Sequence, residues 1–245
     1  MDFKGKTAMI TGASVGIGRA VALLLAEKGA DLLLLDINKE TLAQVRRELE
    51  PYGTRVICHV CDVSREESVN AAVRDGLAHL GKIDILVNNA ALWRDKSLFG
   101  ELSSEKWQQF LNVNVMGVVH CTKAVLAGML DRGYGRIINV ASVAGVYGIA
   151  NMVHYSATKG AVIAMTKALA KETASRNVLV NAVSPGSVSS SEDRDIDAYT
   201  PSELSFLGRT GTDRENAELI CFLASDAASY ISGQNIQIDG CRKKQ

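Results

Sequence analysis

A tyrosine and a lysine four positions apart could carry out proton transfer. Tyr155 and Lys159 begin and end the segment YSATK. On a helix, residues at this spacing share one face, so the ammonium group can lie near the phenol. A phenol normally titrates at about 10, and a neighbouring positive charge favours the phenolate and lowers that pKa. The pair is therefore predicted to exchange a proton with an alcohol or a ketone near neutral pH.

A glycine-rich turn near the N-terminus, at residues 12–18, is a second group of residues that could bind a ligand. It lies between an apolar run at 7–11 and a helical apolar pattern at 19–28. Glycine lets the backbone approach a pyrophosphate closely, and a helix N-terminus attracts its negative charge. The turn residues predicted to bind a dinucleotide are Gly12, Ser14, Val15, Gly16, Ile17 and Gly18.

Asp36 ends the second apolar run, 24 positions after Gly12. A carboxylate at this place can accept hydrogen bonds from both hydroxyls of the adenosine ribose and repels a 2′-phosphate. No arginine stands within the turn before Gly18, and Lys39 is only a weak competitor. The sequence therefore predicts NAD(H) as the cofactor in preference to NADP(H).

Apolar runs and helical patterns alternate along the rest of the chain. Strands are expected at 7–11, 31–36, 55–61, 83–88, 136–140, 178–183 and 235–239. Helices are expected at 19–28, 39–52, 64–80, 103–132, 153–175 and 212–223, the third and last opened by capping boxes at Ser64/Glu67 and Thr212/Glu215. This order predicts an α/β fold: one Rossmann domain over 1–245, with a doubly wound, seven-stranded parallel sheet and helices on both faces.

Composition narrows the function classes. The chain has 245 residues and a formal net charge of zero, so no general attraction to nucleic acid or anionic membranes is expected. The N-terminus lacks a signal-peptide pattern, and we expect a soluble, cytoplasmic protein. Five scattered cysteines argue against a disulfide framework. Cys58 and Cys61 have no partner pair to complete a zinc site, so they are interpreted as strand thiols and no metal is expected.

Taken together, the motifs resemble those of the single-domain short-chain dehydrogenases/reductases over essentially the whole chain. The matching segments are TGxxxGIG at 11–18, Asp62-Val63, Asn88-Asn89-Ala90-Ala91, Asn114, Ser142, Tyr155-x-x-x-Lys159 and Pro185-Gly186. Three positions depart from the usual family pattern without removing a chemical group: Ala91, Ser189 and Cys241. We therefore expect an active enzyme.

The resemblance implies a catalytic role for four residues. Tyr155 would be the general acid/base, and Lys159 would hold the nicotinamide ribose and lower the pKa of that tyrosine. Ser142 would bind and orient the substrate oxygen. Asn114 would hold a water that passes protons between Lys159 and solvent.

The resemblance also implies cofactor contacts beyond the glycine turn and Asp36. The residues concerned are Asp62 and Val63 at adenine, Asn89, Ala90 and Ala91 near the adenosine ribose, Tyr155 and Lys159 near the nicotinamide ribose, and Pro185, Gly186 and Val188 at the nicotinamide amide. Asn88 is expected to brace the sheet.

Substrate contacts are predicted from Ser142, Trp93, Tyr147 and Tyr155. Their largely apolar neighbourhood favours a hydrophobic ketone or secondary alcohol, such as a hydroxysteroid or a cyclic or aromatic alcohol. Residues 187–207 form a long, acidic segment after a strand and are interpreted as a substrate lid.

Two alternatives stay open. The acidic lid and Asp36 argue against a 3-oxoacyl-(acyl-carrier-protein) reductase, whereas Arg94 and Lys96 weaken that argument. The chain could also be a catalytically silent dinucleotide-binding sensor or scaffold, which the intact catalytic set disfavours. Family members commonly pair helices across a two-fold axis, which implies a homotetramer or homodimer here. His154 is expected to line the entrance or cap a helix.

Overall fold

The computed structural model describes residues 1–189 and 194–243. Its centre is a seven-stranded sheet in the order β3-β2-β1-β4-β5-β6-β7, with every neighbouring pair parallel. The strands are β1 Thr7–Thr11, β2 Asp31–Asp36, β3 Val56–Val60, β4 Ile85–Asn88, β5 Gly135–Val140, β6 Val178–Pro185 and β7 Asn235–Ile238. The predicted doubly wound fold is confirmed.

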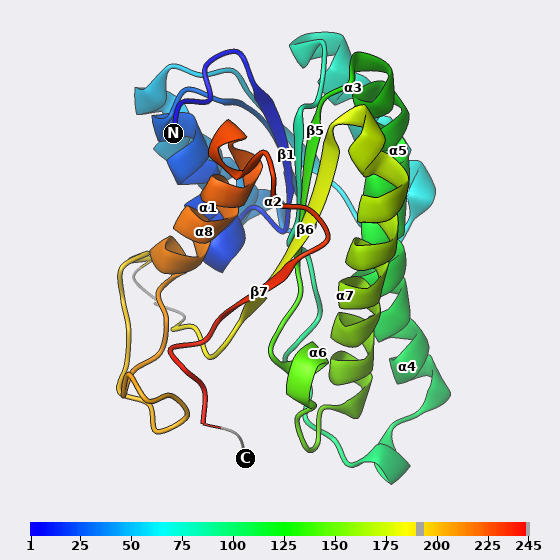
Figure 1. Cartoon of the computed structure of the whole chain (residues 1–245), viewed down its shortest axis with the longest axis vertical. Coiled ribbons are helices and arrows are strands. Elements are labelled where there is room, and N and C mark those ends of the chain that lie inside the picture. The colour runs from blue at the N-terminus through cyan, green and yellow to red at the C-terminus, as the bar shows by residue number, and fades with distance from the viewer. Residues whose placement is uncertain (190–193, 244–245) are drawn as a thin grey trace.

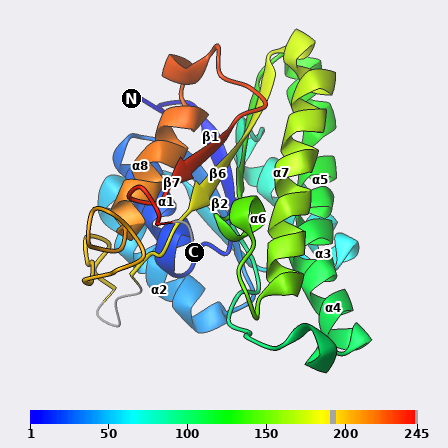
Figure 2. The ribbon, with the colours of Figure 1, turned by 60° about the horizontal axis from the view of Figure 1, so that its bottom comes forward.

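Helices cover both faces of the sheet (Figures 1 and 2). One layer holds α1 Gly16–Glu27, α2 Lys39–Leu49 and α8 Asp213–Ala224. The other holds α3 Glu66–Leu80, α4 Ser104–Leu111, α5 Gly117–Arg132 and α7 Val153–Thr173. A short helix, α6 Ala144–Tyr147, follows β5 and was not predicted.

The strand β2 shows why the sheet is buried on both sides. Leu32, Leu33, Leu34 and Leu35 are all 0% exposed. Alternate residues of a strand point to opposite faces, so Leu32 and Leu34 pack in the core with α1, α2 and α8, whereas Leu33 and Leu35 pack in the core with α3 and α5. A continuous apolar run is what two covered faces require.

Strand order reverses between β1 and β4, because β1 continues to β2 and β4 continues to β5 on the opposite side. The connections after β1 and after β4 therefore leave the sheet in opposite directions and open a crevice at the carboxyl ends of the strands. The glycine turn follows β1, and Asn89 to Ala91 follow β4, so the fold brings both segments to this crevice.

The two predicted capping boxes have different outcomes. Thr212 and Glu215 form the predicted box at the start of α8. The box at Ser64 is wrong: α3 begins at Glu66 after Arg65, and the Ser64 hydroxyl donates to Asp62 Oδ1 at 2.7 Å. Asp62 also accepts the Ser64 amide, so a local turn at the aspartate competes successfully for the serine.

The helix predicted at 103–132 is interrupted by a π-helical segment, Asn112–Met116, between α4 and α5. A π segment has one extra residue in its turn and is frequent at functional sites. By length and hydropathy alone, Ser104–Arg132 could cross a membrane, but such composition is equally that of a core helix, and Cys121, Val125 and Met129 are buried against the sheet.

Candidate active site and cofactor cleft

A cleft of about 1140 Å³ opens at the carboxyl ends of the strands. Most of the predicted site residues line it: Gly12, Val15, Gly16, Ile17, Asp36, Asp62, Val63, Asn89, Ala90, Ala91, Trp93, Ser142, Tyr155, Lys159, Pro185, Gly186 and Val188. Four predicted residues do not line it, namely Ser14, Gly18, Asn114 and Tyr147. The proton-transfer residues and the dinucleotide residues thus share one cavity.

The glycine turn has two tightly packed positions and one open position. A Cβ on Gly12 would lie 2.9 Å from the Ala90 Cα, and one on Gly18 would lie 2.1 Å from the Gly12 carbonyl oxygen. Gly16 has φ of +55° and no atom closer than 3.8 Å to such a Cβ. The helix α1 begins here without a side-chain cap, so its amides can bind the phosphates of a dinucleotide.

Asp36 is held at the end of β2 by two backbone amides. Ser14 donates to its Oδ2 at 3.0 Å and Asn38 to its Oδ1 at 2.9 Å. Ser14 therefore does not line the cleft, but its backbone amide orients the Asp36 carboxylate, which does. The geometry fits a carboxylate whose remaining lone pairs accept ribose hydroxyls.

Residues after β4 hold the glycine turn in shape. The Asn89 side chain donates to the carbonyl oxygens of Thr11 and Gly12 at 3.1 and 2.9 Å, although the residue also lines the cleft. Asn88 donates to Thr122 and Asn139, so its expected bracing of the sheet is confirmed.

Ser142, Tyr155 and Lys159 line one part of the cleft, the predicted catalytic end. The Ser142 hydroxyl oxygen accepts the Ala144 amide at 3.1 Å, and the same side chain hydrogen-bonds Tyr155. Burial raises the pKa of Tyr155, and the bond from Ser142 works in the opposite direction. Desolvation outweighs this hydrogen bond, and the lowering expected from Lys159 together with a positively charged nicotinamide ring stays a prediction.

Lys159 is held by a backbone contact. Its Nζ donates to the Val140 carbonyl oxygen at 2.6 Å and lies 5.8 Å from the centre of the Tyr155 ring. The residue is 3% exposed, and burial lowers its pKa to about 8. Among the ion pairs of the described residues, none includes Lys159. A buried cation near neutral pKa is poised to exchange a proton.

Close packing of α6 on α7 fixes the position of the Lys159 backbone. A Cβ on Gly145 in α6 would lie 2.5 Å from the Lys159 carbonyl carbon, so only glycine lets α6 approach α7 this closely. Sequence reasoning missed Gly145. The available signal was a glycine three residues after Ser142, which alone does not identify its neighbour.

Asn114 connects two parts of the site from within the π-helical segment. Its Oδ1 accepts the Leu92 amide at 2.7 Å, and its Nδ2 donates to the Leu92 carbonyl and to Thr158 Oγ1. Leu92 belongs to the loop after β4, and Thr158 precedes Lys159. The side chain thus holds the loop after β4 against α7, and its predicted water-holding role stays a prediction.

Two of the three predicted aromatic substrate contacts, Trp93 and Tyr147, have different surroundings. Trp93 lines the cleft and stacks with Arg94, whose guanidinium carbon is 4.9 Å from the ring centre. The Tyr147 hydroxyl hydrogen-bonds the side chain of Gln237 in β7, and the residue is not part of the cleft wall. Its place as a substrate contact stays a prediction.

The structure adds charged residues to the cleft that sequence reasoning missed. Arg19 and Arg194 line it near Asp36, although they are far apart in sequence. Asp213, at the start of α8, faces Gly16, and burial raises its pKa to about 6 against an opposing effect of Arg19. No local sequence signal indicates that these residues meet.

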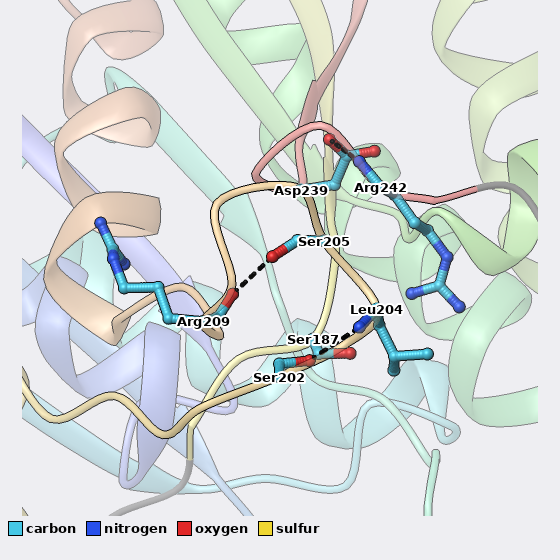
Figure 3. A pocket seen from close by; sticks show the side chains of 7 residues that line it. All are labelled: Ser187, Ser202, Leu204, Ser205, Arg209, Asp239 and Arg242. Atoms are coloured by element: carbon cyan, nitrogen blue, oxygen red, sulfur yellow. Dashed lines mark hydrogen bonds between the residues drawn. The ribbon is translucent and has the colours of Figure 1, made fainter.

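The described part of the lid segment is anchored to the protein. Figure 3 shows Ser187, Ser202, Ser205 and Asp239 around a cavity of about 10 Å³, the room of about one water. The Ser205 hydroxyl donates to the Arg209 carbonyl at 2.8 Å (Figure 3). Elsewhere, Asp197 pairs with Arg214 at 2.7 Å. Glu192 and Asp193, which belong to the acidic segment predicted as the lid, lie outside the described residues.

Comparison with known proteins identifies the family of the chain. A family model described as short chain dehydrogenase matches residues 6–199. The 3-oxoacyl-(acyl-carrier-protein) reductase FabG of Thermotoga maritima is 41% identical over 243 residues, 98% of each chain. The enzyme of that name from Escherichia coli is 36% identical over 248 residues, again 98% of each chain. A crystal structure of NAD⁺-bound xylitol dehydrogenase superposes with a TM-score of 0.89 at 34% identity, over 98% of this chain and 100% of that chain.

Proposed function

Since the chain belongs to the short-chain dehydrogenase family, we propose that it is an NAD(H)-dependent oxidoreductase that interconverts a secondary alcohol and a ketone. One observation carries the proposal: Ser142, Tyr155 and Lys159 lie in the same cleft as the glycine turn and Asp36. That cleft lets a hydride donor and a proton donor meet at one carbonyl group.

In the proposed reaction, the nicotinamide supplies or accepts the hydride. Ser142 orients the substrate oxygen, and the Tyr155 hydroxyl gives its proton to that oxygen during reduction and takes it back during oxidation. Lys159 has a pKa of about 8 and its Nζ lies 5.8 Å from the centre of the Tyr155 ring, so it can supply the proton that restores the tyrosine after reduction. Asn114 holds the loop of Leu92 against this set.

The cofactor is proposed from Asp36. Its carboxylate lies at the adenosine end with both oxygens oriented by backbone amides. A 2′-phosphate placed there would meet a negative charge of the protein. We expect kcat/KM for NADH to exceed that for NADPH by at least about tenfold, since one repelled charge is worth roughly 1.4 kcal/mol or more. Equal turnover with both cofactors would refute the cofactor assignment.

The proposed substrate is a hydrophobic ketone or secondary alcohol, because the apolar side chains of Leu92, Trp93 and Met152 line the same cleft as Tyr155. A 3-oxoacyl thioester is the second candidate. The relatives at 36–41% identity carry the name 3-oxoacyl-(acyl-carrier-protein) reductase. In addition, Arg214 pairs with Asp197, which weakens the argument that an acidic lid repels an acidic carrier protein.

A substrate panel tests these candidates. Purified protein is assayed with NADH or NADPH against steroid ketones, cyclic and aromatic ketones, polyol-derived ketoses and a 3-oxoacyl thioester, followed by absorbance of the nicotinamide. A kcat/KM for one class at least about 10⁴ M⁻¹s⁻¹ identifies the substrate class. Absence of turnover with every class, in either direction, while the cofactor still binds, would favour the silent sensor or scaffold.

The assembly and location are proposals of the same kind. Ala157, Ala164 and Ala168 are exposed along α7 in the single chain, which leaves a small-residue face for a second copy. We propose a homotetramer or homodimer in the cytoplasm, and sedimentation of the purified protein measures the number of copies.

A further inference from the structure

Three charged side chains meet above the adenosine end of the cleft. Arg19 from α1 donates through Nε to Glu48 Oε2 at 2.6 Å, and Arg194 from the lid segment donates through Nε to Glu48 Oε1 at 3.2 Å. Glu48, near the end of α2, is thus the shared acceptor of two guanidinium groups. All three side chains are at least three-quarters buried, with 12%, 25% and 20% of Arg19, Glu48 and Arg194 exposed.

These arginines lie close to the carboxylate proposed to select the cofactor. Arg194 Nη2 donates to the Ser14 carbonyl oxygen at 3.2 Å, and the Ser14 amide donates to Asp36 at 3.0 Å. The backbone of Ser14 therefore links the two side chains: its carbonyl oxygen binds the Arg194 guanidinium and its amide binds the Asp36 carboxylate. Arg19 also donates to the Arg194 carbonyl oxygen at 2.8 Å, which fixes the lid backbone beside the turn.

The balance of charge here depends on Glu48. Arg19, Arg194 and Asp36 line the cleft, whereas Glu48 lies behind them. When Glu48 is ionised, its carboxylate and that of Asp36 balance the two guanidinium groups, and both arginines donate hydrogen bonds to the glutamate. Without that charge, two guanidinium groups would face Asp36 alone. A guanidinium group free of its carboxylate is the best protein ligand for a phosphate, which it binds with two parallel hydrogen bonds.

We propose that Glu48 determines cofactor specificity by holding Arg19 and Arg194 away from the 2′-position of the adenosine ribose. The proposal rests on the proposed use of NAD(H) and extends the selection from Asp36 to a residue outside the cleft wall. Glu48 is a positioning residue: it acts through the two arginines and touches no cofactor. The ligand class excluded is a nucleotide that carries a 2′-phosphate.

Binding of adenosine fragments tests this without knowledge of the substrate. Calorimetry at low salt compares adenosine 5′-monophosphate with adenosine 2′,5′-bisphosphate on the whole protein. We expect Glu48→Gln to bind the bisphosphate about tenfold more tightly than the wild type, with less than about a twofold change for the monophosphate. The gain should shrink as salt rises from about 0.05 to 0.5 M, because released charges are screened.

Two variants separate this effect from loosening of the lid. Asp197→Asn breaks the 2.7 Å ion pair that ties the same segment to Arg214 on α8, outside the cleft, and should leave both affinities unchanged. Arg194→Gln placed on top of Glu48→Gln should remove most of the gain. Glu48→Ala provides a second removal of the charge, and thermal unfolding shows that each variant is folded at the assay temperature.

The outcomes distinguish the two proposals. An unchanged bisphosphate affinity in folded Glu48→Gln and Glu48→Ala overturns the role of Glu48, as does an equal gain in Asp197→Asn. A wild-type protein that already prefers the bisphosphate to the monophosphate contradicts the NAD(H) assignment instead. Persistence of the gain in the double variant shows that Arg194 is not the group that Glu48 restrains, and this also overturns the proposal.

Discussion

The two ends of the cleft treat charge in opposite ways. At the adenosine end, Glu48 compensates two arginines within 3.2 Å. At the catalytic end, Lys159 is buried and its ammonium group donates to the carbonyl oxygen of Val140. An ion pair offsets part of the free energy lost when its charges leave water, whereas burial without a counter-ion lowers the pKa of Lys159 toward neutrality.

This difference indicates a division of labour. At the catalytic end, burial lowers the pKa of Lys159 to about 8, which costs folding free energy at pH 7 and brings its proton exchange close to neutral pH, whereas burial raises the pKa of Tyr155. The adenosine end carries compensated charges that discriminate among ligands by sign and position. Mutations should therefore affect turnover at one end and ligand preference at the other.

Removal of the Tyr155 hydroxyl should have the largest effect. We expect Tyr155→Phe to lower kcat by about 10³-fold, the scale of a lost general acid, because phenylalanine has no hydroxyl to donate the proton. Cofactor affinity should change by less than about threefold. Steady-state kinetics and calorimetric titration of NADH measure the two quantities. Activity that survives unchanged would break the assignment of the catalytic end.

Lys159→Met should separate stability from activity. Because the pKa of Lys159 falls to about 8 in the folded protein, the unfolded chain binds more protons between pH 8 and its ordinary pKa. The wild type therefore gains stability as pH rises through that window and bears the full penalty below it. We expect the variant to be about 2 kcal/mol more stable at pH 7, with the difference reduced at pH 10, and to be nearly inactive.

Urea unfolding at the two pH values measures this difference. Lys167→Met, an exposed lysine on the same helix, is the matched control and should show no such pH dependence. Equal stability of Lys159→Met and the wild type at pH 7 would mean that the buried ammonium group is not the source of the cost.

Asp213 lies at the start of α8, close to Gly16, and its substitution tests the effect of a buried carboxyl group beside the glycine turn. Burial raises the pKa of its carboxyl group to about 6, so the folded state binds more protons and loses stability as pH rises through that value. We expect Asp213→Asn to be more stable than the wild type by about 2 kcal/mol at pH 8 and by much less at pH 4.

The same change should tighten NADH binding a few-fold at pH 8, because a carboxylate beside Gly16 repels the pyrophosphate. Glu218→Gln on the same helix is the control for both measurements. An affinity that is the same at pH 5.5 and pH 8 in the wild type would show that Asp213 does not face the phosphates.

The smallest effect is expected at His154, next to Tyr155. It is 0% exposed, its ring centre lies 4.2 Å from that of Phe110, and neither ring nitrogen has a hydrogen-bond partner among the described residues. Burial lowers its pKa, with Asp95 opposing and Lys106 adding to the shift. The folded protein therefore loses stability as pH falls below the ordinary histidine value.

His154→Phe should gain about 1 kcal/mol at pH 7 and more at pH 5.5, with turnover within about threefold of the wild type. Thermal unfolding and kinetics at the two pH values measure this. A loss of about 100-fold in kcat would contradict this prediction and would indicate that His154 takes part in proton transfer. The expectation that it lines the entrance is wrong, because the side chain is fully buried.

The sequence by itself determined the fold and most of the cleft. Alternating apolar runs and helical patterns are local signals, and the seven strands follow from them because parallel strands buried on both faces must be apolar throughout. Gly12 and Asp36 could be assigned because they lie at the carboxyl ends of strands, where ligands bind, and Tyr155 and Lys159 because their four-residue spacing places them on one helix face.

Only the tertiary structure decided which charges meet. Arg19, Glu48 and Arg194 come from three separate segments, and their contact depends on how the lid segment returns over α1 and α2. The raised pKa of Tyr155 was equally unpredictable, because the effect of Lys159 depends on the direction of its side chain and on burial. Periodicity encodes which face of an element is buried; electrostatics depends on distances between elements, which no local pattern contains.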